Sequence, residues 1–324
     1  MASQTSLHDG EEATTMKGSS SDEQPVFENW MRDLPEKLHN EPLKNIAIPG
    51  SHDSFSYFLD CKSPVASGSP DTVRNLVSVF GDAARKIVHN WSVTQSLDFQ
   101  QQLQLGIRYF DFRVSFCRDR NGFFFVHGLH GNEVCEGLRT IKAWLDDHPK
   151  EVVLLDFNHL YDMDGKHEQL IVALEEIFSS KLCPHMEVSS VSLRMLWENG
   201  WQVLLIYHDS IASSRGCIWP APSIFSVWPN TTEPVQMVNI LNAYHTRGRP
   251  RDRFYVSQGV LTPTGTAILQ HISRSLRDVL ARPAIKNTKF FLKDKKIGPE
   301  GVNIVIADFV EIDHFVETVL ALNH

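Results

Sequence analysis

The chain has 324 residues, of which 42% are hydrophobic and 22% are charged, so it can form one large buried core. Its formal net charge of −8 argues against a duplex nucleic-acid binder, which needs a clustered Lys and Arg surface. No apolar run approaches the roughly 18 residues that span a bilayer, and the first residues lack the pattern of a secretory signal. We therefore expect a cytoplasmic protein whose five scattered cysteines are free thiols.

The first 26 residues differ in composition from the rest of the chain. They are rich in Ser, Thr, Gly and acidic residues and carry few side chains that could be buried, which predicts a disordered tail. From residue 27 onward apolar runs begin and recur to the end of the chain. Residues 27–324 are therefore predicted to form a single domain.

Seven short apolar runs are typical of buried strands. Each is four to seven residues long and rich in β-branched or aromatic side chains, and most do not alternate with polar residues as a half-exposed strand would. The runs cover residues 45–49, 109–114, 123–126, 152–157, 202–207, 254–258 and 303–309.

Helical patterns lie between these runs, at residues 137–148, 168–178 and 266–280. Strands that alternate with helices indicate a mainly parallel sheet, and seven or eight such units favour closure into an α/β barrel.

Polar residues follow almost every predicted strand. In a β/α barrel the active site forms at the carboxyl ends of the strands, so these residues are candidates for function. If the last strand pairs with the first, Asp308 should lie beside His52, and Arg113 and His127 should follow on the next two strands. In chain order the candidates are His52, Asp53, Asp111, Arg113, His127, Asp156, Asn158, Tyr207, His208, Ser257, Gln258 and Asp308.

These side chains suit the cleavage of a phosphodiester by an internal hydroxyl group. Histidine can accept or donate a proton near neutral pH. Arginine is a permanent planar cation that binds phosphate oxygens. A carboxylate behind each imidazole would fix its tautomer and stabilise its protonated form. The sequence therefore holds a base, an acid and a cation, without a cluster of metal ligands.

Three separated motifs carry a family resemblance: Ile48-Pro49-Gly50-Ser51-His52-Asp53-Ser54, the stretch from Gly106 to Arg113, and Val126-His127-Gly128. They resemble the X domain of phosphatidylinositol-specific phospholipases C, and residues 27–324 look like the small eukaryotic X-domain proteins without accessory modules. The resemblance implies an irregular or distorted TIM (β/α)8 barrel. It also implies cleavage of inositol phospholipids to diacylglycerol and a cyclic inositol phosphate.

The resemblance also implies a role for each matching residue. His52 would be the general base, supported by Asp308, and His127 the general acid, supported by Asp53. Arg113 matches a position where bacterial enzymes have arginine and the large eukaryotic signalling enzymes have a calcium-binding acid. An arginine there would supply the positive charge itself and repel Ca²⁺, so we expect no metal and no other cofactor.

The predicted substrate-binding residues depart from the family pattern. Asn158 stands where bacterial enzymes carry an inositol-binding lysine, and Gln258 falls near an acidic inositol-binding position. His208 is the nearest candidate for an arginine that follows the fifth strand. Asp111 and Tyr207, also at strand ends, complete the predicted set. The headgroup contacts, and with them the identity of the substrate, therefore stay open.

Two alternatives to an active phospholipase C remain: a lipid- or inositol-phosphate-binding module with weak turnover, and a metal-dependent barrel phosphodiesterase. An inositol phospholipid is the expected partner, with no obligate protein partner and with peripheral membrane contact as a further option. Residues 217–229 gather Trp, Phe and Pro as interfacial anchors do. Residues 286–296 interleave Lys with Phe, a pattern that can attract anionic lipid. A loop folded onto the protein and a solvated helix explain these two segments equally well.

Overall fold

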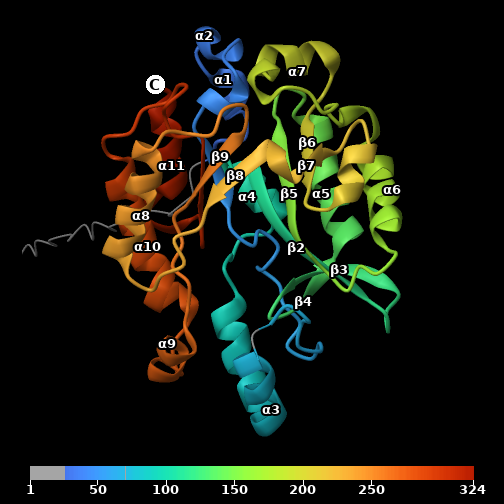
Figure 1. Cartoon of the computed structure of the whole chain (residues 1–324), viewed down its shortest axis with the longest axis vertical. Coiled ribbons are helices and arrows are strands. Elements are labelled where there is room, and N and C mark those ends of the chain that lie inside the picture. The colour runs from blue at the N-terminus through green and yellow to red at the C-terminus, as the bar shows by residue number, and fades with distance from the viewer. Residues whose placement is uncertain (1–25, 70) are drawn as a thin grey trace, which may run out of the picture.

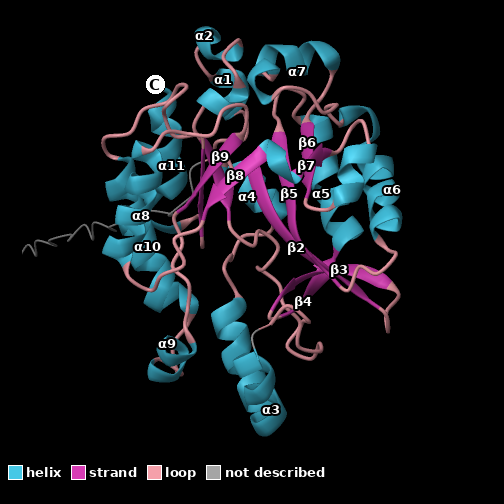
Figure 2. Cartoon of the chain, viewed as in Figure 1, coloured by secondary structure: helices cyan, strands magenta, loops and turns pink. Residues whose placement is uncertain are grey.

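The computed structural model describes residues 26–69 and 71–324. The predicted disordered tail therefore lies outside the described residues, apart from its last position, Val26. The rest forms one α/β domain in which a curled sheet is surrounded by helices (Figures 1 and 2).

A curled, mainly parallel sheet forms the centre of the domain. Its hydrogen-bonded order is β7-β6-β5-β2-β1-β10-β9-β8, and every pair along this path is parallel. Along the path the strands are β7 (Trp219–Pro220), β6 (Val203–Tyr207), β5 (Val153–Tyr161), β2 (Tyr109–Cys117), β1 (Ile48–Ser51), β10 (Ile304–Ala307), β9 (Phe254–Gln258) and β8 (Ile224–Val227). The first and last strands of the chain, β1 and β10, are neighbours, as the barrel prediction requires.

The barrel is incomplete between β7 and β8. These two strands end the path, and no ladder joins them among the described strands. Aromatic rings approach each other across this gap: Trp219 on β7 and Phe254 on β9, the strand next to β8, have ring centroids 6.1 Å apart. The expectation of a distorted TIM barrel is therefore confirmed as a curled parallel sheet that does not close through backbone hydrogen bonds.

Helices cover the outside of the sheet and both of its ends (Figure 2). In chain order they are α1 (Trp30–Asp33), α2 (Glu36–His39), α3 (Asp71–Ser92), α4 (Phe99–Leu105), α5 (Val134–Asp147), α6 (His167–Phe178), α7 (Leu193–Asn199), α8 (Pro234–Thr246), α9 (Gly265–Gln270), α10 (Arg282–Leu292) and α11 (Phe315–Leu320). The predicted helices at 137–148 and 168–178 correspond to α5 and α6. The single helix expected at 266–280 is instead divided into α9 and a π-helical turn at Arg277–Ala281, which continues directly into α10.

The run at residues 123–126 does not form the parallel barrel strand that we expected. It belongs to β3 (Gly122–His127), which pairs antiparallel with β2 and then with β4 (Leu129–Glu133). Figure 1 shows this antiparallel extension projecting from one end of the sheet, the end beyond which α3 and α9 also extend. His127 therefore comes from a hairpin beside the barrel, next to Arg113 on β2, and not from a third parallel strand.

The two segments considered as membrane contacts are ordered parts of the fold. Residues 217–229 contain β7 and β8, and residues 286–296 include most of α10. Exposed apolar side chains remain in both, with Trp228 55% and Phe290 69% exposed. Among the described residues, no helix combines the length and the apolar character needed to cross a bilayer.

Candidate active site

A cavity of about 450 Å³ opens at the carboxyl ends of the strands, where the sequence predicted the functional residues. Its polar lining contains most of the predicted site residues: His52, Asp111, Arg113, His127, Asn158, Gln258 and Asp308. Asp53 is fully buried and contacts several of these side chains. The structure thus brings together all five residues predicted to be catalytic.

His52 and Asp308 form a short polar contact within this group. Nδ1 of His52 donates to Oδ1 of Asp308 at 2.7 Å, because a carboxylate can only accept. This hydrogen bond leaves Nε2 of His52 facing the remaining polar side chains, 3.4 Å from Nη2 of Arg113. The predicted support of His52 by Asp308 therefore has a matching geometry.

The strand register explains why His52 and Asp308 meet. Ser51 at the end of β1 pairs with Ala307 at the end of β10, so the next residue of each strand is aligned with its partner. A Cβ atom at Gly50 would lie 2.8 Å from both Ile306 and Tyr109, so only glycine allows this close approach of three strands. The Gln95 amide ties the two strand ends together by donating to the carbonyl oxygens of His52 and Ala307, at 2.9 and 3.0 Å.

Asp53 occupies a sharp turn directly after β1. Its φ of 41° lies in the left-handed region, which aspartate tolerates better than most residues. The turn directs its carboxylate toward Arg113, whose Nε lies 2.7 Å from Oδ1 of Asp53. The backbone N–H of Asp53 donates to Oδ2 of Asp111 at 3.1 Å, which joins the turn to β2.

His127 lies across the site from His52, with the two ring centroids 6.4 Å apart. Its Nδ1 donates to the backbone carbonyl of Ser92 at 2.7 Å, and its Nε2 lies 3.3 Å from Oδ2 of Asp53. We expected a carboxylate behind this imidazole to fix its tautomer, and that detail is wrong. A backbone carbonyl fixes the tautomer, while Asp53 faces the same nitrogen that would exchange a proton with a substrate.

The charges around His52 determine its protonation. Burial lowers the pKa of His52, but the negative charges of Asp53 and Asp308, the hydrogen bond to Asp308 and the charge of Asp111 outweigh burial and raise the pKa to about 9. Burial raises the pKa of Asp53, but the positive charges of Arg113, His127 and His52 outweigh burial and lower that pKa to about 2. In the free protein at neutral pH, His52 is therefore an imidazolium beside an ionised Asp53.

His127 has the opposite tendency. Burial lowers the pKa of His127 below 6.5, and the positive charges of Arg113 and His52 lower it further, while Asp53 opposes both effects only in part. The two histidines are thus pushed apart in pKa by their surroundings, a pattern that marks paired acid–base groups.

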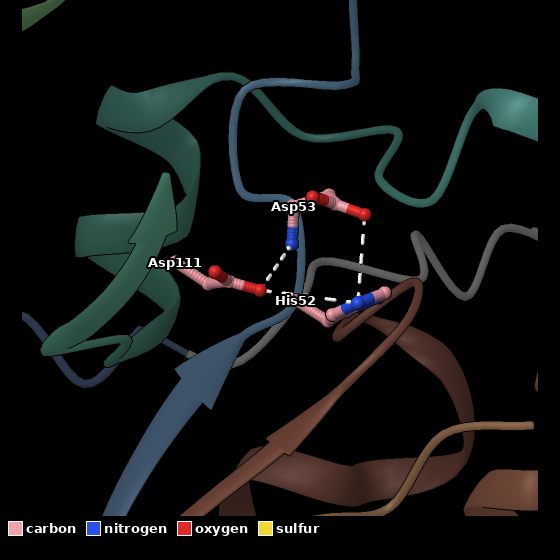
Figure 3. A group of neighbouring side chains, drawn as sticks. All are labelled: His52, Asp53 and Asp111. Carbon is pink, nitrogen blue, oxygen red and sulfur yellow. Dashed lines mark hydrogen bonds and ion pairs between the residues drawn. The ribbon is translucent and has the colours of Figure 1, made fainter. Parts of the chain in front are cut away.

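Three of these side chains could in principle share a cation. His52, Asp53 and Asp111 each offer one ligand atom, and these atoms lie within 4.8 Å of one another (Figure 3). The Arg113 guanidinium, however, already pairs with Asp53, and a divalent cation beside it would be repelled. The donor set therefore fits a metal poorly while Arg113 is in place, and the expected metal independence stays a prediction.

The predicted substrate-binding residues divide into two groups. Asn158, Gln258 and Asp111 line the cavity, whereas Tyr207 and His208 do not. Tyr207 is fully buried and its hydroxyl contacts His167, at 2.9 Å. Nε2 of His208 lies 2.8 Å from Oδ1 of Asp156, outside the cavity.

Asn158 also departs from a simple ligand contact. Its amide Nδ2 donates to Asp111, and its Oδ1 accepts from Nδ1 of His159 at 2.6 Å. Both ends of the amide are therefore used within the protein, so Asn158 links Asp111 to His159 in this state.

Sequence analysis missed several residues that shape the site. Ser92 is the last residue of α3 and Gln95 follows it, so neither lies at the end of a strand. Ser92 acts through its backbone carbonyl, which no side-chain pattern reveals. His159 lines the cavity one position after Asn158, close enough to a predicted strand end to have been included.

The chain is similar over nearly its whole length to a group of curated proteins. It is 43% identical over 312 residues to PI-PLC X domain-containing protein 3 of Mus musculus, covering 95% of this chain and 97% of that protein. It is 42% identical to PI-PLC X domain-containing protein 2 of Mus musculus, over 91% of this chain and 87% of that protein. It is 33% identical to PI-PLC X domain-containing protein 1 of Homo sapiens, over 91% of this chain and 92% of that protein. No protein-family model matches the sequence.

Solved structures of bacterial proteins share this fold. The phosphatidylinositol-specific phospholipase C of Listeria monocytogenes aligns with a TM-score of 0.61 at 18% identity, over 93% of this chain and 99% of that chain. A Staphylococcus aureus phosphatidylinositol-specific phospholipase C, solved in work on its membrane binding, aligns with a TM-score of 0.64 at 19% identity, over 92% and 98% of the two chains. At such identities the likeness shows the fold.

Proposed function

The chain belongs to the family of PI-PLC X domain-containing proteins, and from this premise we propose that it is a phosphoric diester hydrolase of the phospholipase C type. The proposed substrate is an inositol phospholipid, and the products are diacylglycerol and a cyclic inositol phosphate. The observation that carries the proposal is the grouping of His52 and His127 around the Arg113–Asp53 ion pair in one cavity.

The geometry supports a specific role for each side chain in the reaction. Nε2 of His52 removes the proton from the inositol hydroxyl group, whose oxygen then bonds to phosphorus. The bond from phosphorus to the glycerol oxygen breaks, and Nε2 of His127 donates a proton to that oxygen. Arg113 holds the phosphate oxygens and stabilises their negative charge as the transition state forms. Asp308 stabilises the imidazolium that forms at His52.

Proton positions in the free protein differ from those that the reaction requires. The free protein favours a proton on His52 and none on His127, whereas the reaction starts from neutral His52 and protonated His127. A phosphodiester adds a negative charge beside both imidazoles, so the proton balance changes when substrate binds. The reactive form is then a minor protonation state, which affects the height of the pH profile but not its bell shape.

Asn158, Gln258 and Asp111 are the proposed contacts for the inositol hydroxyl groups, because they are the predicted substrate-binding residues that reach the cavity. Gln258 is oriented by a hydrogen bond from its Nε2 to Oγ of Ser226 at 2.8 Å. We propose a cytoplasmic enzyme that acts at a membrane surface, since its substrate is a lipid and the chain shows exposed apolar side chains such as Leu269 near the cavity-lining Ile268.

The decisive experiment is mass spectrometry of the products formed from a panel of phosphoinositides in EDTA. Release of a cyclic inositol phosphate by the wild type, and its loss in His52→Gln, would support the proposal. His314→Gln is the matched control, because the His314 side chain is 75% exposed and lies outside the cavity. Lipid binding without any product would identify a binding module, and activity that appears only with Ca²⁺ or Mg²⁺ would identify a metal-dependent phosphodiesterase.

A further inference from the structure

The chain at the end of α3 contacts both proposed acid–base groups. The carbonyl oxygen of Ser92 accepts from Nδ1 of His127 at 2.7 Å. Three residues later, Nε2 of Gln95 donates to the carbonyl oxygens of His52 and Ala307, at 2.9 and 3.0 Å. One short segment therefore contacts the hairpin of β3 and β4 and the carboxyl ends of β1 and β10.

The amide group of Gln95 bonds on both sides of Asp308. Its Nε2 donates to the carbonyl oxygen of Ala307, the residue before Asp308. Its Oε1 accepts from the backbone N–H of Val310, two residues after Asp308, at 3.3 Å. The same Nε2 also donates to the carbonyl oxygen of His52. Gln95 therefore connects the backbone of His52 to the backbone on either side of its carboxylate partner.

The contact between His52 and Asp308 depends on the alignment of these two chain segments. The register of β1 and β10 ends at Ser51 and Ala307, one position before the two side chains that meet. Beyond that point, contacts from outside the sheet have to hold the backbone, and those of Gln95 are among them. Because a hydrogen bond weakens steeply as its angle departs from linear, a small shift of either backbone would weaken this contact.

Gln95 can act only through other residues, because it is fully buried and does not line the cavity. Both of its carbonyl acceptors have a second donor. Oγ1 of Thr94 donates to the carbonyl oxygen of His52 at 3.0 Å, and the N–H of His52 donates to the carbonyl oxygen of Ala307 at 3.1 Å. Removal of the Gln95 amide would therefore leave neither carbonyl without a partner, so it should disturb alignment more than folding.

From these contacts we propose that Gln95 is a positioning residue that keeps Nδ1 of His52 aligned with Asp308. It acts through the backbone at the ends of β1 and β10 and makes no contact with the substrate. The inference rests on the proposed function in one respect, because it takes His52 as the base of the reaction. The alignment itself can be measured without turnover.

NMR titration of His52 in the full chain reports this alignment. The Cε1–H signal of His52 is identified by its absence from the His52→Gln protein. Burial lowers the pKa of His52, whereas nearby carboxylates and the hydrogen bond to Asp308 raise it to about 9. The charged and titratable groups that face its imidazole are Asp53, Asp111, Arg113, His127 and Asp308.

Gln95→Met has a side chain of similar length without a donor. It should lower the titration midpoint of His52 by about 0.5–1 pH unit, because the hydrogen bond to Asp308 is weakened while the carboxylates remain. In product assays it should lower kcat by about tenfold, since the base is misplaced. KM should stay within about twofold, because Gln95 makes no contact with the substrate.

A double-mutant cycle separates positioning from a general loss of structure. In the Asp308→Asn background the charged partner of His52 is absent. Adding Gln95→Met there should lower the midpoint of His52 by less than about 0.2 pH unit, because residues that act through one contact are not additive.

Gln202→Met is the matched control. Gln202 is also buried, and its Nε2 also donates to two backbone carbonyl oxygens, those of His148 and Glu151, at 2.8 and 2.9 Å. It directly precedes β6 and does not line the cavity. Replacing it should leave both the His52 midpoint and kcat unchanged.

A second variant, Gln95→Asn, guards against a Met variant that does not fold. Its amide is one methylene shorter and cannot reach both carbonyl oxygens, so it should give the same shift. Thermal unfolding shows which variants are folded. If neither Gln95 variant folds, the residue maintains the fold and not the site, and the inference is overturned.

The outcomes for the positioning role and for the proposed function are separate. An unchanged His52 midpoint, a shift of full size in the Asp308→Asn background, or an equal shift in Gln202→Met would overturn the positioning role. Absence of product from the wild type, together with a shift that depends on Asp308, would reject the phospholipase activity and keep the positioning role.

Discussion

Nδ1 of His52 and Oδ1 of Asp308 lie 2.7 Å apart although the two residues are separated by 256 positions in the chain. They meet because β1 and β10, the first and last strands of the chain, are parallel neighbours in the sheet, with Ser51 paired to Ala307. The contact fixes the tautomer of His52 and raises its pKa. The pairing of β1 with β10 therefore affects the protonation of His52.

Removing the charge of Asp308 should change the pH profile. We expect kcat/KM of the wild type to be bell-shaped, with an acid limb below pH 6.5 from His127 and an alkaline limb near pH 9 from His52. Because Asp308 raises the pKa of His52, Asp308→Asn should move the alkaline limb to lower pH and reduce the maximum. Asp313→Asn is the control, since Asp313 is half exposed and pairs with Lys289. An alkaline limb that stays near pH 9 in Asp308→Asn would contradict the assignment to His52.

Arg113 should be needed for the rate and not replaceable by solvent cations. Arg113→Ala should lower kcat/KM by roughly 10²–10³-fold, the usual effect of losing one preorganised group that stabilises transition-state charge. Arg113→Lys should lose less, because the charge remains while the planar fork of donors is lost. EDTA should leave wild-type activity unchanged. Inhibition by EDTA that Ca²⁺ reverses would show that the cation in this site is a metal and not the guanidinium.

Much of the architecture could be predicted because buried strands have recognisable apolar sequences. Strands such as β5 and β6 are covered on both faces, so their apolar runs are continuous, and the residues that follow them share one end of a parallel sheet. The same reasoning placed Asp308 beside His52, since a barrel has to bring its last strand next to its first. The polar residues at the carboxyl ends of the strands could therefore be predicted from the sequence alone.

The direction of β3 was not predictable from its apolar run alone. Residues 123–126 are as apolar as a barrel strand, but residues 118–121 form a turn between β2 and β3. Asn121 ends this turn with a φ of 46°, and Gly122 begins β3. An Asn-Gly pair between two apolar runs indicates a hairpin, and this signal was available. The link from His127 to Ser92 was not, because a backbone carbonyl is common to every residue type.

A buried ion pair at the opposite end of the sheet should contribute strongly to stability. Nε and Nη2 of Arg108 both donate to Oε2 of Glu151, at 2.9 and 2.8 Å, and both side chains are fully buried. Glu151 also accepts from the backbone N–H groups of Met31 and Arg32, which attaches α1 to the barrel.

Replacing Glu151 by Gln leaves the charge of Arg108 buried without a negatively charged partner, so we expect the free energy of unfolding to fall by about 3–5 kcal/mol. Urea unfolding followed by circular dichroism measures this loss. Glu36→Gln is the matched control, because the exposed Glu36–Arg194 pair is worth at most about 1 kcal/mol. Equal losses of unfolding free energy in the two variants would show that the buried ion pair stabilises the fold no more than the exposed pair does.

Asp53 should make the stability of the fold depend on acid pH. Its pKa is lowered from 3.8 to about 2 in the folded protein, mainly because Arg113 and the two histidines outweigh the effect of burial. A lowered pKa means that the contribution is complete above pH 3.8 and is lost as the pH falls through about 2, and its size is about 2 kcal/mol. The difference in unfolding free energy between wild type and Asp53→Asn should therefore be largest above pH 4 and narrow toward pH 2. Asp33→Asn is the control, because Asp33 is an exposed carboxylate beside Arg32 and lies on α1, away from the cavity. A difference that is constant from pH 2 to 6 would mean that Asp53 stabilises the turn after β1 through its shape and not through its charge.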